Sequence, residues 1–140
     1  MVGWVSRRRA AVPKYLYSVG LKKSKLLFGG HSIEPTDFVC VTEGTLDTMW
    51  LRQNGYPSVA LLGMHLSNKQ KDLLAKLRTQ EVVLCLDNDE AGKTGLDKAL
   101  QSIGNTLMVS YIELSDDYKD VQEIQNKKVL DKVINKRYYW

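Results

Sequence analysis

The stretch Val82-Val83-Leu84-Cys85-Leu86 followed by Asp87-Asn88-Asp89-Glu90-Ala91-Gly92 decides the fold of this chain. A second stretch, Phe38-Val39-Cys40-Val41 followed by Thr42-Glu43-Gly44, has the same form, because an apolar run again ends in an acidic residue. Short apolar runs of this length between helical patterns are typical of buried parallel strands. Ligands of open α/β sheets bind beyond the carboxyl ends of the strands, so we expect Glu43, Asp87 and Asp89 to gather at one edge.

These three acids predict a magnesium site. Asp87 and Asp89 are two residues apart, so they point the same way if the chain stays extended after the strand. Converging carboxylates repel one another unless a hard divalent cation neutralises them. The structural alternatives are turn and N-cap roles for the two aspartates and a first-turn helix role for Glu43. Gly44 favours a functional site, since glycine lets a backbone or a phosphate approach closely.

The rest of the chain alternates helix and strand patterns. After the first strand at 38–41, strands are predicted over 58–62, 82–86 and 106–112. Helices are predicted over about 46–53, from a capping box at Ser67 onward, and over an apolar face that ends at Gly104. This β-α-β-α-β-α-β order predicts an α/β fold with a four-stranded parallel sheet and right-handed crossovers.

The two ends of the chain are expected to add smaller elements. A last helix is predicted from near Asp120 toward Tyr138-Tyr139-Trp140. At the amino terminus, Val2, Trp4 and Val5 suggest a short edge strand.

The two acidic motifs carry a family resemblance. Glu43-Gly44 and Asp87-x-Asp89-x-Ala91-Gly92 resemble the Toprim domain of DnaG-type and phage primases. The resemblance implies a Toprim-like sheet and two further metal-facing acids, Asp47 and Asp120. The alternatives are a surface acid for Asp47 and a helix cap for Asp120, because Asp120-Val-Gln-Glu123 is a good capping sequence. After Lys119-Asp120 the match is partial, because Val121 and Gln122 replace the Pro and the second Asp of the family. One carboxylate of the bacterial enzymes is therefore without an evident counterpart.

The resemblance also predicts how the chain is divided. Residues 1–35 are expected to be a basic segment equivalent to the end of the larger amino-terminal subdomain of primases. Residues 36–115 are expected to form the Toprim core, and residues 116–140 a carboxy-terminal helix. An excised fragment of a longer primase and a naturally reduced version both remain open.

The amino-terminal segment is strongly basic. The first 30 residues hold seven Lys and Arg residues and no acid, in a chain of net charge +4. Such an arm ahead of an acidic edge suits a polyanion that approaches a metal, although a solvated face would have the same composition. The resemblance assigns nucleotide or template contacts to Lys14, Lys23 and Lys25. Gly92 and Lys93, in the first turn of a predicted helix, suit phosphate contact together with Gly44.

Length and composition limit the classes of protein. At 140 residues the chain is one domain's worth, and no apolar run approaches the ~20 residues of a membrane span. No signal-peptide core follows Arg7-Arg8-Arg9, so we expect a protein of the bacterial or phage-infected host cytoplasm with no membrane partner. Cys40 and Cys85 lie inside predicted strands and form no Cys-x-x-Cys pair, which makes a structural zinc site unexpected.

The favoured interpretation is therefore a primase catalytic core, a nucleotidyltransferase with Glu43, Asp87 and Asp89 as catalytic residues. It would make short RNA on single-stranded DNA from ribonucleoside triphosphates, with Mg²⁺ as cofactor and Mn²⁺ as a possible substitute. A replicative helicase or a separate zinc-binding module is expected as a partner. The alternatives are a Toprim nuclease that cleaves phosphodiesters and a non-catalytic DNA-binding Toprim module. A topoisomerase would need a catalytic tyrosine on another domain, for which the chain is too short.

Overall fold

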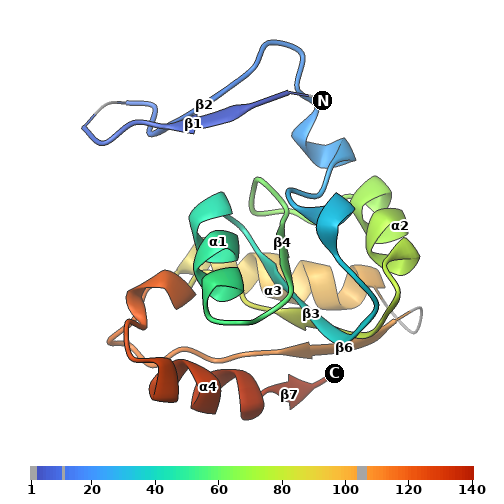
Figure 1. Ribbon diagram of the computed structural model, residues 1–140, viewed down its shortest axis with the longest axis vertical. Helices are drawn as coiled ribbons and strands as arrows, with labels where there is room; N and C mark the ends of the chain where they lie inside the picture. Colours follow the sequence, from blue (N-terminus) through green and yellow to red (C-terminus); the bar gives the residue numbers. More distant parts are fainter. Residues whose placement is uncertain (1–2, 11, 104–106) are drawn as a thin grey trace.

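A five-stranded sheet forms the centre of the computed structural model, which describes residues 3–10, 12–103 and 107–140 (Figure 1). Its strand order is β4-β3-β5-β6-β7. The strands are β3 (Thr36–Thr42), β4 (Ser58–Ala60), β5 (Thr79–Leu84), β6 (Met108–Tyr111) and β7 (Tyr138–Tyr139). The first four run parallel, and β7 pairs antiparallel with β6. The predicted α/β fold with a parallel sheet is confirmed, and β7 is one strand more than predicted.

Helices cover both faces of this sheet. They are α1 (Thr45–Gln53), α2 (Asn68–Lys76), α3 (Glu90–Ile103) and α4 (Lys127–Asn135), with short 3-10 helices η1 (Lys23–Lys25), η2 (Gly30–Ser32) and η4 (Val121–Glu123). Val39 and Val41 of β3 pack with residues of α2 and α3, whereas Cys40 packs on the other face with residues of α1, η4 and α4. This division follows from the alternation of side chains along a strand.

The capping box predicted at Ser67 is confirmed at the start of α2. Its hydroxyl accepts a hydrogen bond from the Gln70 N–H at 3.1 Å, and its own N–H donates to Gln70 Oε1 at 3.1 Å. Gln70 is fully buried and also reaches outside α2, where its Nε2 donates to the carbonyl oxygens of Leu26 at 2.9 Å and Leu61 at 2.8 Å. One side chain therefore starts a helix and fastens the amino-terminal segment to it.

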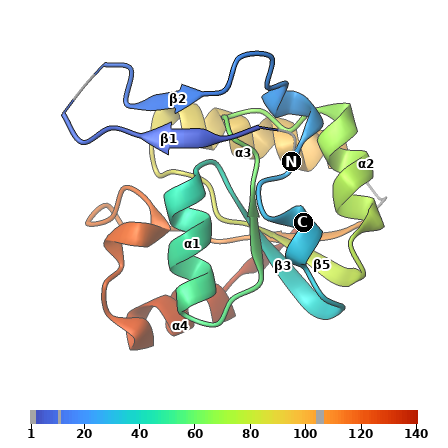
Figure 2. The ribbon, with the colours of Figure 1, turned by 45° about the horizontal axis from the view of Figure 1, so that its top comes forward.

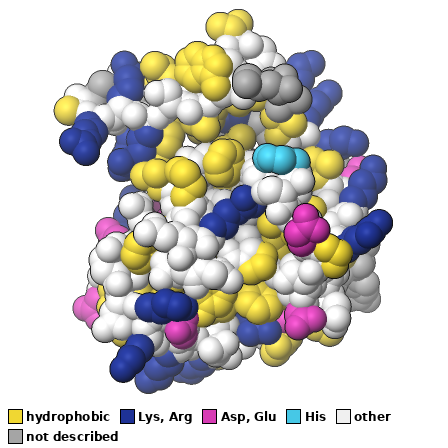
Figure 3. All heavy atoms as spheres, viewed as in Figure 1, with side chains coloured by type: hydrophobic (Ala, Val, Ile, Leu, Met, Phe, Trp, Pro, Cys, Tyr) yellow, Lys and Arg dark blue, Asp and Glu magenta, His cyan; other side chains and the backbone are white. Residues whose placement is uncertain are grey.

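The amino-terminal segment forms a small sheet of its own. Strands β1 (Val5–Arg7) and β2 (Tyr15–Tyr17) pair antiparallel, and this hairpin lies above the ends of α1 and α3 (Figures 1 and 2). Phe28 ties the segment to β4 by two main-chain hydrogen bonds with Ala60, of 3.0 and 3.2 Å. Hydrophobic side chains gather around the hollow left between hairpin and body, a cavity of about 770 Å³ (Figure 3).

The carboxy-terminal end differs from the sequence prediction. A continuous helix was expected from near Asp120, but the chain forms η4, breaks, and starts α4 only at Lys127. The reason is a second cap, because the Asn126 side chain accepts hydrogen bonds from the N–H groups of Lys128 and Val129. Tyr138 and Tyr139 extend the sheet as β7 and do not continue the helix.

The short strand expected at the amino terminus pairs with β2 and not with the central sheet, and Val2 lies outside the described residues. Gly104, which was expected to end a helix, and Thr106, which was expected to begin a strand, also lie outside the described residues. Among the described residues, no helix has both the length and the apolar content that a membrane crossing requires.

Candidate functional site

The loops that follow β3 and β5 meet at the carboxyl edge of the sheet. Glu43 comes directly after β3, and Asp87 follows the end of β5. The Asp87 N–H donates a hydrogen bond to Glu43 Oε1 at 3.3 Å. The two acidic motifs of the sequence therefore lie side by side, as the topology of parallel neighbouring strands requires.

Three acids of this edge have a raised pKa. Burial and then the charge of Asp87 raise the pKa of Glu43 to about 7. Burial and then the charges of Asp120 and Asp87 raise the pKa of Asp47 to about 7. The pKa of Asp87 is also raised, by burial and then by Asp120 and Asp89. We call Glu43, Asp47, Asp87, Asp89 and Asp120 the acidic edge, since the charges of these acids act on Glu43, Asp47 and Asp87.

Asp47 is the most enclosed member of the acidic edge. It lies in the first turn of α1 with 9% of its surface exposed. Its Oδ1 atom is buried and has no hydrogen-bond partner among the described residues. A buried carboxylate oxygen without a partner is costly, so this atom is available to a cation.

Asp89 and Asp120 also have structural duties. Asp89 Oδ1 accepts a hydrogen bond from the Gly92 N–H at 2.8 Å and so caps α3. Asp120 Oδ1 accepts one from the Glu123 N–H at 3.1 Å and caps η4, as its capping sequence predicted. Each cap uses one carboxylate oxygen and leaves the other. The capping role considered for Asp89 is therefore present in the structure, and it leaves one carboxylate oxygen for a metal ion.

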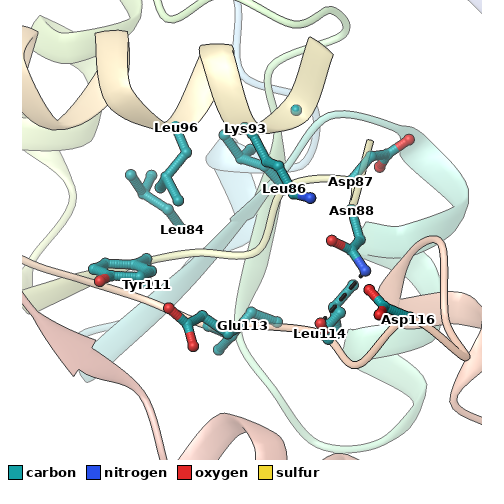
Figure 4. A pocket seen from close by; sticks show the side chains of 12 residues that line it. Leu84, Leu86, Asp87, Asn88, Lys93, Leu96, Tyr111, Glu113, Leu114 and Asp116 are labelled. Carbon is teal, nitrogen blue, oxygen red and sulfur yellow. Dashed lines mark hydrogen bonds between the residues drawn. The ribbon is translucent and has the colours of Figure 1, made fainter. Parts of the chain in front are cut away.

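Of the three residues predicted to contact phosphate near the acids, Gly44, Gly92 and Lys93, only Gly44 lines the cavity at the acidic edge. Gly44 lies at the acidic edge, where an added Cβ would come 2.7 Å from Asp47 Oδ2. At Gly92 an added Cβ would come 1.9 Å from the main-chain oxygen of Asp87, so this glycine lets α3 pack against the Asp87 backbone. Lys93 lines a different cavity of about 360 Å³, together with Leu84, Leu86 and Leu96, and Asp87 also borders it (Figure 4).

The chemistry of the acidic edge suits a hard cation. Its donors are all carboxylate oxygens, which Mg²⁺ and Mn²⁺ prefer, and Asp47 contributes an oxygen that nothing else satisfies. Among residues 3–10, 12–103 and 107–140, no three acidic, His or Cys side chains already form a cluster that could hold a metal ion. A bound cation would therefore have to draw the carboxylates together from around a shared space.

A basic wall faces the acidic edge across a cavity of about 310 Å³. The acidic side consists of Glu43, Gly44, Asp47, Asp87 and Asp120, and the opposite side is formed by Arg7, Lys14, Tyr15, Tyr17 and Lys23 of the amino-terminal segment. Lys23 Nζ lies 4.5 Å from the centre of the Tyr17 ring, a cation–π contact. Two predicted contacts, Lys14 and Lys23, are thus brought to the acidic edge, whereas Lys25 is not among the described residues that line the cavity.

The sequence interpretation missed part of this wall. Arg7, Tyr15, Tyr17 and Lys119 line the cavity but were not proposed as site residues. A signal for the tyrosines was present, because Tyr15 and Tyr17 flank an exposed Leu16 at strand spacing and so share one face.

Comparison with known proteins places this arrangement in a family. The Toprim-like family matches residues 40–125. An uncharacterized protein of Mycoplasma pneumoniae is 33% identical over 132 residues, which are 89% of this chain and 61% of that protein. A DNA primase of Legionella pneumophila is 39% identical over 98 residues, which are 64% of this chain and 17% of the primase.

A solved structure agrees with these relatives. The crystal structure of the zinc-binding and RNA polymerase domains of the Aquifex aeolicus primase superposes with a TM-score of 0.83 at 29% identity. The match covers 99% of this chain and 38% of that one. The chain therefore spans 61% of the length of the Mycoplasma pneumoniae relative and much less of the two primases.

Proposed function

Because this chain belongs to the Toprim-like family, we propose that it is a primase-type catalytic core that joins ribonucleotides on a single-stranded DNA template. One observation carries the proposal: four acids of the acidic edge, Glu43, Asp47, Asp87 and Asp120, line the same cavity as the basic wall. A templated polymerase must bind polyanions and catalyse phosphoryl transfer at one place. The basic wall would bind the polyanions, and the acidic edge would hold the metal for phosphoryl transfer.

The acidic edge would hold the metal. Glu43, Asp87 and Asp89 are the proposed catalytic ligands, with Asp47 and Asp120 as further carboxylates. Asp89 is not among the described residues that line the cavity, but its charge acts on Glu43 and Asp87. When bound, Mg²⁺ or Mn²⁺ supplies a lowered pKa of the attacking 3′-hydroxyl and neutralises charge that develops on the transferred phosphoryl group.

The chain's own cations would bind the other parts of the substrates. Lys14, Lys23 and Arg7 would hold phosphates of a triphosphate or of the template, across the cavity from the acids, which repel phosphate. Tyr15 and Tyr17 offer ring faces for a base, and the Lys23–Tyr17 contact keeps that lysine beside its ring. Lys25 and Lys93, which are not among the described residues that line this cavity, stay predictions for contacts with nucleotide or template.

Two alternatives use only half of this arrangement. A nuclease needs the acidic edge and a metal-activated water, and a binding module needs the basic wall alone. The facing walls favour the polymerase over both. A helicase or a zinc-binding module remains a proposed partner, supported by the zinc-binding domain in the Aquifex aeolicus primase. The cytoplasmic location expected from the sequence also stays a prediction.

The test is a synthesis assay with the 140-residue chain, single-stranded DNA, the four ribonucleoside triphosphates and Mg²⁺ or Mn²⁺. We expect short oligoribonucleotides from wild-type protein, none from Glu43→Gln, and undiminished product from Glu34→Gln, which changes an exposed acid away from the cavity. Template nicking that needs no nucleotides and disappears in Glu43→Gln would favour the nuclease. DNA binding with neither product nor nicking would favour the binding module.

A further inference from the structure

Asn88, between the two aspartates of the second acidic motif, fastens the loop that leads from β6 to η4. Its side-chain Nδ2 lies 3.4 Å, 3.2 Å and 3.3 Å from the carbonyl oxygens of Leu114, Ser115 and Tyr118. Its main-chain N–H donates to the carbonyl oxygen of Lys119 at 2.7 Å. Figure 4 shows Asn88 pointing from the end of β5 toward Leu114 and the loop beyond it.

This loop needs such an anchor, because residues 112–120 form neither helix nor strand. Its internal main-chain contact is a turn in which the Tyr118 N–H donates to the Ser115 carbonyl at 3.0 Å. The group that gathers the loop must be a hydrogen-bond donor, since all its partners are carbonyl oxygens. An amide side chain has two N–H donors, and a carboxylate at the same position would have none.

The loop delivers Lys119 and Asp120 to the acidic edge. Both line the same cavity as Asp47 and Asp87, although their own segment is remote from α1 and β5 in the sequence. The side-chain bond from Asn88 to Tyr118 and its main-chain bond to Lys119 end directly before Asp120. The position of Asp120 relative to Asp87 is therefore set by the residue next to Asp87.

We propose that Asn88 is a positioning residue of the acidic edge: its amide holds Asp120 beside Asp47 and Asp87 and so determines how tightly the edge binds a divalent cation. The inference rests on the proposed function, because it assumes that the edge is a cation site. Asn88 acts through Asp120 and touches neither cation nor substrate. Partners of this kind in metal sites change cation affinity by about 10–100-fold when they are removed.

The experiment compares Asn88→Ala with Asn54→Ala by titrating Mn²⁺ into each protein. Asn54 is the matched control, because its Nδ2 donates to a carbonyl, that of Trp50 at 2.9 Å, at the end of α1 away from the cavity. We expect a Kd for Mn²⁺ about 10-fold weaker in Asn88→Ala and unchanged in Asn54→Ala. In metal-free protein, hydrogen exchange of the Tyr118 and Glu123 amides should accelerate in Asn88→Ala alone.

A double-mutant cycle with Asp120→Asn separates positioning from general destabilisation. If Asn88 acts through Asp120, its removal should weaken Mn²⁺ binding much less in the Asp120→Asn background. The inference would be overturned if the two substitutions weakened Mn²⁺ binding by independent factors that multiply in the double variant, or if hydrogen exchange of the loop were unchanged. Either result would leave the proposed function intact. Wild-type protein that binds no Mn²⁺ would overturn both.

Discussion

The main-chain N–H of Asp87 donates a hydrogen bond to the carboxylate of Glu43, with 3.3 Å between the nitrogen and Oε1. The bond joins the chain at the ends of two neighbouring parallel strands, β3 and β5. The same proximity places the Asp87 carboxylate where it raises the pKa of Glu43. A backbone hydrogen bond therefore holds the two loops together, while the carboxylates of the acidic edge repel one another.

Metal-free protein should lose stability as the pH rises from about 5 to about 8. The pKa of Glu43 is raised from 4.5 to about 7 and that of Asp47 from 3.8 to about 7. At pH values between the ordinary and the raised pKa, the folded state binds more protons than the unfolded state. The free energy of unfolding therefore falls as both groups ionise. Urea unfolding in chelator should show a fall of roughly 1 kcal/mol per group after allowance for solvent screening.

The control for this pH dependence is the pair Glu43→Gln and Asp47→Asn. Each substitution removes one titrating group, so each should flatten the pH profile in chelator. Saturating Mg²⁺ should restore stability to wild-type protein at pH 8, because a cation favours the ionised carboxylates. A wild-type profile that rises between pH 5 and pH 8 would contradict the raised pKa values.

Substitutions of Asp89 should separate its cap from its charge. Asn at this position keeps an acceptor for the Gly92 N–H, so Asp89→Asn should retain the stability of the metal-free protein or exceed it, while the melting temperature no longer rises with Mg²⁺. Asp89→Ala also loses the cap and should cost about 1 kcal/mol more. Equal melting temperatures for the two variants in chelator would show that the cap contributes nothing.

The basic wall should bind single-stranded DNA through phosphates. Replacing both Lys14 and Lys23, which line the cavity, should reduce the log–log salt slope of binding by up to ~1.4, since each phosphate contact on a single strand contributes ~0.7. Lys76→Ala, in the last turn of α2, is the control and should leave the slope unchanged. Fluorescence anisotropy with a labelled oligonucleotide at several salt concentrations measures this, and an unchanged slope in the double variant would remove both lysines from the template path.

The two ion pairs found among the described residues should differ in their contribution to stability. Arg137 Nε and Nη2 lie 2.6 Å and 2.9 Å from the two carboxylate oxygens of Glu81, which is 6% exposed and also accepts the Ser110 hydroxyl. Arg137→Ala leaves this buried carboxylate without its cation and should cost about 3 kcal/mol. Lys127→Ala breaks the exposed pair with Asp131 and should cost less than about 1 kcal/mol in the same urea titration.

Local patterns were enough for the order of strands and helices in the core. The apolar runs before Glu43 and Asp87 became neighbouring strands β3 and β5, and Ser67 capped α2 as its spacing predicted. The prediction failed near Asn126, because Asp120 and Asn126 are both good caps and the sequence does not show which of them starts the long helix. It failed again at Tyr138, where pairing with β6 outweighs the helical pattern.

The sequence by itself determined that the motifs of Glu43 and Asp87 end parallel strands at one edge, since that follows from strand spacing and crossover handedness. Only the tertiary structure decided which charges share a cavity. Lys14 and Lys23 reach the acidic edge because Gln70 and Ala60 anchor the segment that carries them, whereas Lys93 lines a different cavity. Such placement depends on contacts between residues far apart along the chain, and no local periodicity encodes them.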